Sequence, residues 1–232
     1  MKDIYWFKNI FAENGFVLDN YKLTKLAKYC ELLIEKNSKV NLISSKSENN
    51  IWEEHILHSL SFLLKVKIKE DSKILDLGSG GGLPGIPLKI VYPDLDVTLL
   101  DSTQKKILAD KEMISSLGLE GIKAIAGRAE ELKTLPELKE KYDYVICRAV
   151  APLDKLFEWS IPFLKKDTIY SPDHLPTCSV LAIKGGDIDE EIKRVKRNKL
   201  FGRMEITDIL FSGVEELLNP DKKLVVMFLK KS

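Results

Sequence analysis

The chain has 232 residues, with 36 Lys and Arg against 35 Asp and Glu and a net charge of +1, so it is neither strongly basic nor strongly acidic. Apolar residues make up 44%, which is enough for a sizeable core. Three widely spaced cysteines and no long apolar run exclude a disulfide framework and a membrane span. No Cys/His cluster has zinc spacing, so we expect a soluble, cytoplasmic protein without metal.

The first part of the chain is predicted to be helical. Apolar residues recur at helical spacing in the ranges 21–36 and 51–64, with a polar loop predicted over 37–50. No strand pattern interrupts this part. We therefore expect residues 1–70 to form a helical N-terminal extension, followed by a second domain over residues 71–232.

From Ser72 onward, strand patterns alternate with helical patterns, which predicts a mostly parallel sheet with helices on both faces. The predicted strands are Lys73–Leu77, Asp96–Asp101, Ile122–Ala126, Tyr144–Cys147, Val180–Lys184, Glu205–Phe211 and Lys223–Leu229. The predicted helices are Pro84–Val91, Thr103–Leu117, Ala129–Leu132, Leu153–Leu164 and Asp189–Arg197.

The end of the predicted sheet differs from its beginning. Between the last two strands, Glu215–Leu218 can form at most one helical turn and Asn219–Asp221 marks a bend, so these strands should run antiparallel. The expected fold class is thus α/β, a Rossmann-like and mostly parallel seven-stranded sheet with an antiparallel end. An insertion, Lys165–Ser179, contains Pro172, His174 and Pro176 and is predicted to be an exposed loop.

A glycine-rich turn follows the first predicted strand. Asp76 is the last acid of that strand, and Gly78, Gly80 and Gly82 come directly after it. Glycines let a backbone turn approach a ligand closely, just before a helix begins. The second strand ends in Asp101, about twenty residues on, where an acid can accept both hydroxyls of a ribose. Together these features predict a site for a nucleoside-type cofactor.

Two cofactor classes fit such a site, and Asp76 separates them. A dinucleotide would place its pyrophosphate at this turn, where a carboxylate would repel it. S-adenosylmethionine (SAM) has no phosphate and carries an ammonium that Asp76 would attract, directly or through water. The glycine spacing also departs from the dinucleotide pattern. The residues therefore favour a class I SAM-dependent methyltransferase over a nicotinamide enzyme.

Several segments resemble one methyltransferase family. The run from Asp76 to Leu88, with its Leu83-Pro84-Gly85-Ile86-Pro87 ending, resembles the signature of the bacterial 16S rRNA guanine-N7 methyltransferases, the RsmG (GidB) family. Further similar segments are Leu99–Ser102, Gly127–Glu131, Ile146–Ala151, Ala182–Gly185, Asn37–Ile43 and His55–Leu60. The chain departs from the family pattern at His58, usually Asp, at Lys36, usually Trp, and in the longer insertion over 165–179.

The resemblance implies a reaction and a set of site residues. It implies transfer of a methyl group from SAM to N7 of one guanine in the decoding-region loop of 16S rRNA, with the RNA or the small subunit as partner. It also implies that the cofactor is held by Gly78, Leu83, Ala129, Glu130 and Arg148, which join Asp76, Gly80 and Asp101. Glu130 could instead be a solvated helix start, and Arg148 could contact the cofactor carboxylate, an RNA phosphate or a surface acid.

The expected chemistry needs positioning more than proton transfer. Guanine N7 already carries a lone pair and loses no proton when it is methylated, so no catalytic residue is predicted beyond a possible contact from Arg148. Cys147 lies in the region where cytosine-C5 enzymes place a thiolate, but it lacks their sequence context. We expect Cys147 to be a small buried strand residue.

The RNA must meet basic side chains, for which we expect Lys184, Lys193, Arg194, Lys196 and Arg197. The alternative for the last four is a solvated helix face, balanced by nearby acids. Two other functions stay open from the sequence: a methyltransferase acting on a small molecule or a protein, and a SAM-binding RNA protein without catalysis. We expect a monomer.

Overall fold

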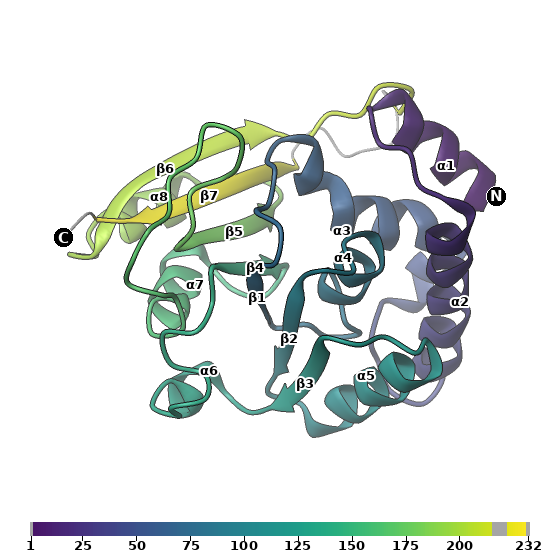
Figure 1. Cartoon of the computed structure of the whole chain (residues 1–232), viewed down its shortest axis with the longest axis horizontal. Coiled ribbons are helices and arrows are strands. Elements are labelled where there is room, and N and C mark those ends of the chain that lie inside the picture. Colours follow the sequence, from purple (N-terminus) through teal and green to yellow (C-terminus); the bar gives the residue numbers. More distant parts are fainter. Residues whose placement is uncertain (1, 215–221, 231–232) are drawn as a thin grey trace.

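The computed structural model describes residues 2–214 and 222–230. Its centre is a seven-stranded sheet with the strand order β3-β2-β1-β4-β5-β7-β6 (Figure 1). The first five strands in this order are parallel, and β7 lies antiparallel between β5 and β6. The predicted fold class, with its antiparallel end, is confirmed. The strands are β1 Lys73–Leu77, β2 Asp96–Asp101, β3 Ile122–Ala126, β4 Tyr144–Arg148, β5 Ser179–Lys184, β6 Phe201–Asp208 and β7 Lys223–Leu229.

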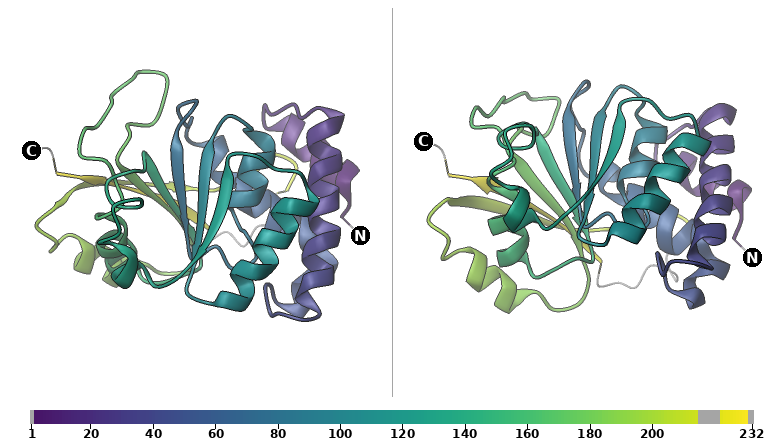
Figure 2. Two further views of the ribbon diagram at one scale, coloured as in Figure 1. Left: turned by 60° about the horizontal axis from the view of Figure 1, so that its bottom comes forward. Right: turned by 90° about the horizontal axis from the view of Figure 1, so that it is seen from below.

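Helices cover both faces of the sheet (Figure 2). The helices are α4 Gly85–Val91, α5 Gln104–Ser116, α6 Ala129–Leu132, α7 Leu153–Ser160 and α8 Asp189–Val195. Successive strand residues point to opposite faces, so Ile74 and Ile146 join one hydrophobic cluster while Leu75 and Val145 join another. The first cluster lies under α4 and α5, and the second under α7 and α8.

The N-terminal part is helical, as predicted, and forms a further layer outside α4 and α5 (Figure 2). It comprises α1 Ile4–Glu13, α2 Asn20–Asn37, a 3₁₀ helix Ser45–Asn50, a π-helical turn Trp52–Leu57, α3 His58–Leu60 and a 3₁₀ turn Ser61–Leu64. The loop predicted over 37–50 is wrong at its end, where Ser45–Asn50 is helical. None of the described helices combines the length and apolar character of a membrane span.

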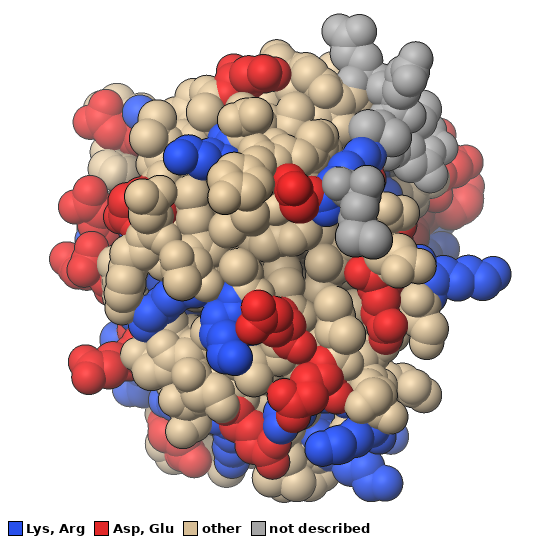
Figure 3. Space-filling view, turned by 90° about the vertical axis from the view of Figure 1, so that its right-hand side faces the viewer, with Lys and Arg blue, Asp and Glu red and all other residues tan. Residues whose placement is uncertain are grey.

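The N-terminal layer shares its core with the sheet. Leu26 and Leu33 of α2 lie in the same buried cluster as Ile86 of α4 and Leu83 just before it. The outer face of this layer carries acids and bases interspersed, without a field of one sign (Figure 3). We retain residues 1–70 and 71–232 as a proposed division of the chain, and we propose that its two parts fold together because their core is continuous.

Three elements differ from the predictions by two residues or more at an end. β6 begins four residues earlier than the predicted Glu205–Phe211, because pairing with β7 sets its bounds rather than its own apolar pattern, and most of its side chains are exposed. α7 ends at Ser160 instead of Leu164, and α8 ends at Val195 instead of Arg197. The predicted turn Glu215–Leu218 and the bend Asn219–Asp221 lie outside the described residues. The predicted antiparallel pairing of the last two strands is confirmed.

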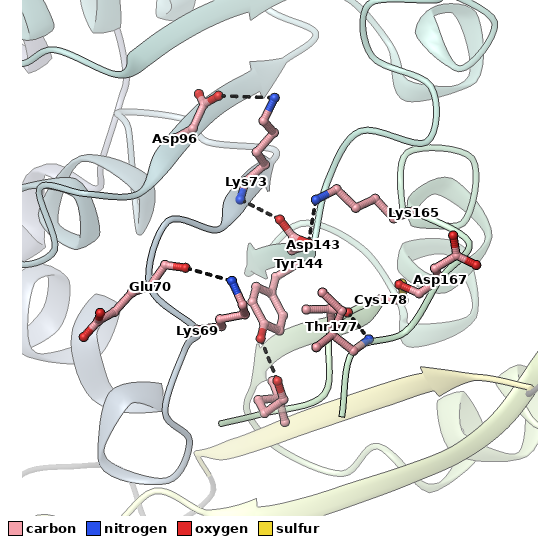
Figure 4. Close-up of polar contacts among 12 residues, drawn as sticks. Lys69, Glu70, Lys73, Asp96, Asp143, Tyr144, Lys165, Asp167, Thr177 and Cys178 are labelled. Carbon is pink, nitrogen blue, oxygen red and sulfur yellow. Dashed lines mark hydrogen bonds and ion pairs between the residues drawn. The ribbon is translucent and has the colours of Figure 1, made fainter. Parts of the chain in front are cut away.

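The insertion over 165–179 is only partly exposed, which corrects the prediction. Leu175, Thr177 and Cys178 are buried. The Tyr144 hydroxyl donates a hydrogen bond to the Leu175 carbonyl at 2.6 Å, and Lys165 forms an ion pair with Asp143 at 2.8 Å (Figure 4). These contacts hold the insertion at the edge of the sheet where β1 and β4 begin. The carboxyl ends of these strands lie at the opposite edge.

Candidate cofactor site

A cavity of about 550 Å³ opens where β1, β2 and β4 end. Parallel sheets commonly bind ligands at this carboxyl edge. Of the residues predicted to hold the cofactor, the structure brings seven to the cavity wall: Gly78, Gly80, Leu83, Asp101, Ala129, Glu130 and Arg148. Asp76 is not among the lining residues. Residues that the sequence did not single out also line it, namely Leu42, Val150 and Trp159.

The glycine turn has a backbone conformation that requires glycine. Gly78 has a φ of +77° and Gly80 a φ of +60°. The amide of Gly78 donates to the Leu100 carbonyl of β2 at 2.7 Å, which anchors the turn to the neighbouring strand. Val150, in the loop after β4, packs directly over Gly78, so that a Cβ on Gly78 would lie 2.5 Å from Val150 Cγ2. Because Gly78 and Gly80 line the cavity and have no side chains, the turn presents bare backbone to it.

Asp101 joins the glycine turn to the end of β2. Its Oδ2 accepts a hydrogen bond from the Gly80 amide at 3.0 Å, and its Oδ1 accepts one from the Thr103 amide at 2.8 Å. Each carboxylate oxygen retains a lone pair for a further donor. Because Asp101 lines the cavity, both oxygens are placed where ribose hydroxyls could reach them.

Asp76 is placed differently from the sequence-based expectation. It is fully buried, and its Oδ2 accepts a hydrogen bond from the Gly85 amide at 2.7 Å, while Oδ1 has no partner among the described residues. Burial raises the pKa of Asp76 to about 7. The carboxyl thus holds the first amide of α4 from beneath the turn. A contact with the cofactor ammonium, as the sequence suggested, would have to be indirect.

Arg148 connects the end of β4 to the N-terminal layer. Its guanidinium donates to the Glu54 carbonyl at 3.0 Å and to His55 Nδ1 at 2.9 Å. Since arginine can only donate, Nδ1 accepts, and Nε2 carries the proton that it shares with the Ser47 hydroxyl at 2.7 Å. Burial lowers the pKa of His55 to about 4. Within the described chain Arg148 makes no salt bridge, so the surface ion pair considered from the sequence is wrong.

Tyr29 is a site residue that the sequence analysis missed. It lies on α2, is fully buried, and donates its hydroxyl to the Gly81 carbonyl at 2.6 Å. Its only sequence signal was a position among the apolar residues of an amphipathic helix. Leu42 reaches the cavity from the same layer because the Asn37 side chain accepts the amide of Leu42 at 2.8 Å. The helical layer therefore shapes the back of the glycine turn.

Replacing Tyr29 with phenylalanine should loosen this turn. The ring would still fill its space, but the Gly81 carbonyl would lose its buried donor, at a cost of about 1–2 kcal/mol of unfolding free energy. We expect SAM affinity to fall severalfold as well. Urea unfolding and calorimetric titration with SAM would measure both effects. Exposed Tyr21, replaced in the same way, is the matched control, and equal effects of the two substitutions would contradict the assignment.

A second buried carboxyl, Asp110 of α5, also lies behind the turn. Burial raises the pKa of Asp110 to about 8. The unfolded-state pKa of an aspartate is about 4, so between pH ~4 and ~8 the folded chain holds more protons than the unfolded chain through Asp76 and Asp110. Stability conferred by a raised pKa is lost as the pH rises through that range. Burial lowers the pKa of His55 to about 4 and of His58 to about 3, which opposes the trend below pH ~6.5.

Above pH ~6.5 the histidines are neutral in both the folded and the unfolded chain, so only the two carboxyls should change the stability with pH. We expect the free energy of unfolding to decrease by about 2–3 kcal/mol between pH 6.5 and 8.5. Asp110→Asn should reduce this slope because the amide does not titrate. Denaturant unfolding at several pH values measures it, and an identical slope in the variant would show that Asp110 does not titrate in this range.

Most of the predicted RNA-binding residues are engaged with acids. Lys184 pairs with Glu191 at 2.9 Å, Lys193 with Glu190 at 2.6 Å, and Arg194 with Asp154 at 3.1 Å. Lys196 and Arg197 are exposed and follow the end of α8, which runs away from the carboxyl edge of the sheet. The two bases that line the cavity are instead Lys106 and Arg128, besides Arg148. Cys147 is buried in β4, as expected, and burial raises its pKa.

The residues at the cavity fit SAM. The cavity volume lies in the range of about 300–1,000 Å³ that small-molecule sites occupy. A cradle of bare backbone at Gly78 and Gly80, a carboxylate at the end of the next strand and an apolar contact at Leu83 match its amino-acid part, its ribose and its methylene chain. A pyrophosphate at the turn would meet the Asp101 carboxylate, which is bonded to the turn itself and would repel it.

Comparison with known proteins agrees with this geometry. The model of the family described as "rRNA small subunit methyltransferase G" matches residues 22–218. The chain is 40% identical over 195 residues to the protein of that name from Thermoanaerobacter sp., covering 83% of this chain and 77% of the relative. It is 36% identical to the one from Chlorobaculum tepidum over 226 residues, covering 97% of both.

Solved structures resemble the fold. A SAM-dependent methyltransferase from Aquifex aeolicus matches with a TM-score of 0.54 at 15% identity, covering 81% of this chain and 99% of that one. A predicted O-methyltransferase from Agrobacterium tumefaciens has the same score and identity over 77% and 81%. Strand order, cavity and sequence similarity thus lead to one assignment: the chain belongs to the rRNA small subunit methyltransferase G family.

Proposed function

We propose that the chain transfers the methyl group of SAM to N7 of one guanine in the 16S rRNA of the small ribosomal subunit. Membership of the family supports a methyltransferase of small-subunit rRNA. The observation that carries the proposal further is the cavity wall itself, where the described lining contains an acid for ribose and bare glycine backbone but neither histidine nor cysteine. Such a wall suits a nucleophile that needs no deprotonation.

The roles of the residues follow from their places. Asp101 would accept the ribose hydroxyls, Gly78 and Gly80 would pass their backbone along the amino-acid part, and the backbone of Ala129 and Glu130 would meet the adenine edge. Bound SAM supplies an electrophilic methyl group on a positively charged sulfur. The protein then has to hold N7 in line with that group and to keep water out. No side chain needs to remove a proton.

The RNA would approach the open side of this cavity. Lys106 and Arg128 at its wall offer charge to phosphates, and exposed Lys196 and Arg197 offer a more distant contact. Lys184, Lys193 and Arg194 would have to exchange their acid partners for RNA. Trp159, the one aromatic side chain of the described lining, is our candidate for stacking on a base that leaves its helix.

The test is transfer of a labelled methyl group from SAM to small ribosomal subunits taken from cells that lack this activity. Borohydride–aniline cleavage then locates 7-methylguanine, and a single cleavage in the decoding-region loop is the expected result. Naked 16S rRNA and large subunits serve as parallel acceptors. SAM binding without label in any ribosomal acceptor would overturn the proposal and favour the small-molecule or protein substrate. Label without cleavage would leave rRNA methylation standing and exclude N7.

A further inference from the structure

A carboxyl outside the cavity faces the back of the glycine turn. Asp110 lies on α5 and is fully buried. Its Oδ2 accepts a hydrogen bond from the Ser79 hydroxyl at 3.2 Å, and its Oδ1 is buried without a partner among the described residues. Ser79 itself lines the cavity. One hydrogen bond therefore separates the Asp110 carboxyl from the cavity wall, and the mechanism proposed above makes no use of it.

The charged and titratable groups that act on Asp110 come from four elements. They are Asp76 of β1, Asp101 of β2 and Lys106 of α5, and Tyr29 of α2 is also coupled to it. Two of the three charged groups are acids, and Lys106 is the single cation among them. A negative charge on Asp110 is thus opposed by burial and by like charges. These effects raise the pKa of Asp110 to about 8, so that the carboxyl can gain or lose a proton near neutral pH.

SAM and its product differ in charge. SAM carries a carboxylate, an ammonium and a sulfonium, whereas the product S-adenosylhomocysteine lacks the sulfonium charge. A positive charge in a site of low dielectric favours the ionised form of a nearby carboxyl. We propose that Asp110 is a specificity-determining residue, which ionises when SAM fills the cavity and takes up a proton again when the product, whose sulfur is uncharged, replaces it.

This inference rests on the proposed function only in that SAM must bind at the cavity. Its consequence is a preference for SAM over its product that strengthens as the pH rises. By linkage, a site that releases a proton on binding SAM binds it more tightly at higher pH. The product lacks the sulfonium charge, so its affinity should depend less on pH.

Asp110 can be tested separately from Asp76. The Asp76 carboxyl accepts the Gly85 amide at the start of α4, so its replacement would disturb the turn directly. Among the described residues, the one hydrogen bond to the Asp110 side chain comes from the Ser79 hydroxyl, and asparagine at position 110 can still accept it. Asp110→Asn therefore removes the titration and keeps the hydrogen bond and the shape.

The experiment is calorimetric titration of the full chain with SAM and, separately, with S-adenosylhomocysteine at pH 7.5. Two buffers with different ionisation enthalpies yield the number of protons released. We expect the wild-type chain to release on the order of half a proton more with SAM than with the product. The affinity ratio of SAM over product should rise roughly three- to tenfold between pH 6.5 and 8.5. In Asp110→Asn both differences should largely disappear.

Two further variants make the result decisive. Ser79→Ala keeps the carboxyl but removes the hydroxyl that favours its ionised form. The SAM-specific proton release should therefore persist and move to higher pH, and its absence at pH 7.5 and at pH 8.5 alike would overturn the proposal. If Asp110→Asn does not fold, Asp110→Leu provides the same readout, because it too lacks a titrating group. Unchanged proton release in a folded Asp110 variant would also overturn it. If the wild-type chain bound neither ligand, the proposed function itself would fail.

Discussion

Replacing Gly78 with alanine should reduce SAM affinity by at least a hundredfold, or about 3 kcal/mol. The residue has a φ of +77°, where a side chain costs about 1–2 kcal/mol. The added methyl would lie 2.5 Å from Val150 Cγ2, so either Val150 or the turn must move. Since the Gly78 amide is also bonded to the Leu100 carbonyl of β2, a shift of the turn would disturb the wall of the cavity.

Calorimetric titration with SAM would measure this loss, and two variants isolate its cause. Gly118→Ala is the matched control, because Gly118 also has a positive φ of +56° but has no atom within 4 Å of the added methyl. It should lower stability slightly and leave SAM affinity unchanged. Adding Val150→Ala to Gly78→Ala should restore part of the affinity by removing the two nearest methyl groups. Normal binding in Gly78→Ala would refute the steric argument.

Replacing Arg148 with alanine should lower methyl transfer by about a hundredfold or more and also destabilise the chain. The guanidinium donates to the Glu54 carbonyl and to His55 Nδ1, and hydrogen bonds to charged groups contribute about 1.5–3 kcal/mol each. The substitution would leave the Nδ1 acceptor of His55 without its donor. Arg148→Lys should recover little, because one ammonium cannot reproduce the two parallel donors of the guanidinium.

Two measurements separate the effects of Arg148. Denaturant unfolding should show a loss on the order of 2–4 kcal/mol for Arg148→Ala, consistent with two broken contacts between β4 and the N-terminal layer. Arg128→Ala is the control for stability, since Arg128 is exposed at the same cavity and should leave the unfolding free energy unchanged. Methyl transfer measured under conditions where each variant is folded gives the second effect. Equal stability of Arg148→Ala and the wild-type chain would contradict the connecting role.

The position of β6 shows where local patterns stop being informative. In β1, β2 and β5, buried on both faces, short apolar runs marked the strands to within one residue. β6 lies at the edge of the sheet with most of its side chains exposed, so no apolar pattern defined it. Its bounds depend on β7, with which it pairs from Phe201 to Asp208. Pairing between distant segments is not encoded in the residues of one strand.

The same division applies to the site. The sequence by itself determined the parallel α/β fold, the glycine turn and Asp101, because strand periodicity, backbone freedom and the acid at a strand end are local properties. Only the tertiary structure decided that Tyr29 and Leu42 of the helical layer complete the turn, and that Asp76 lies beneath it, not in the cavity. It likewise decided which bases are paired with acids. Contacts between segments far apart in the chain depend on packing, which no local pattern records.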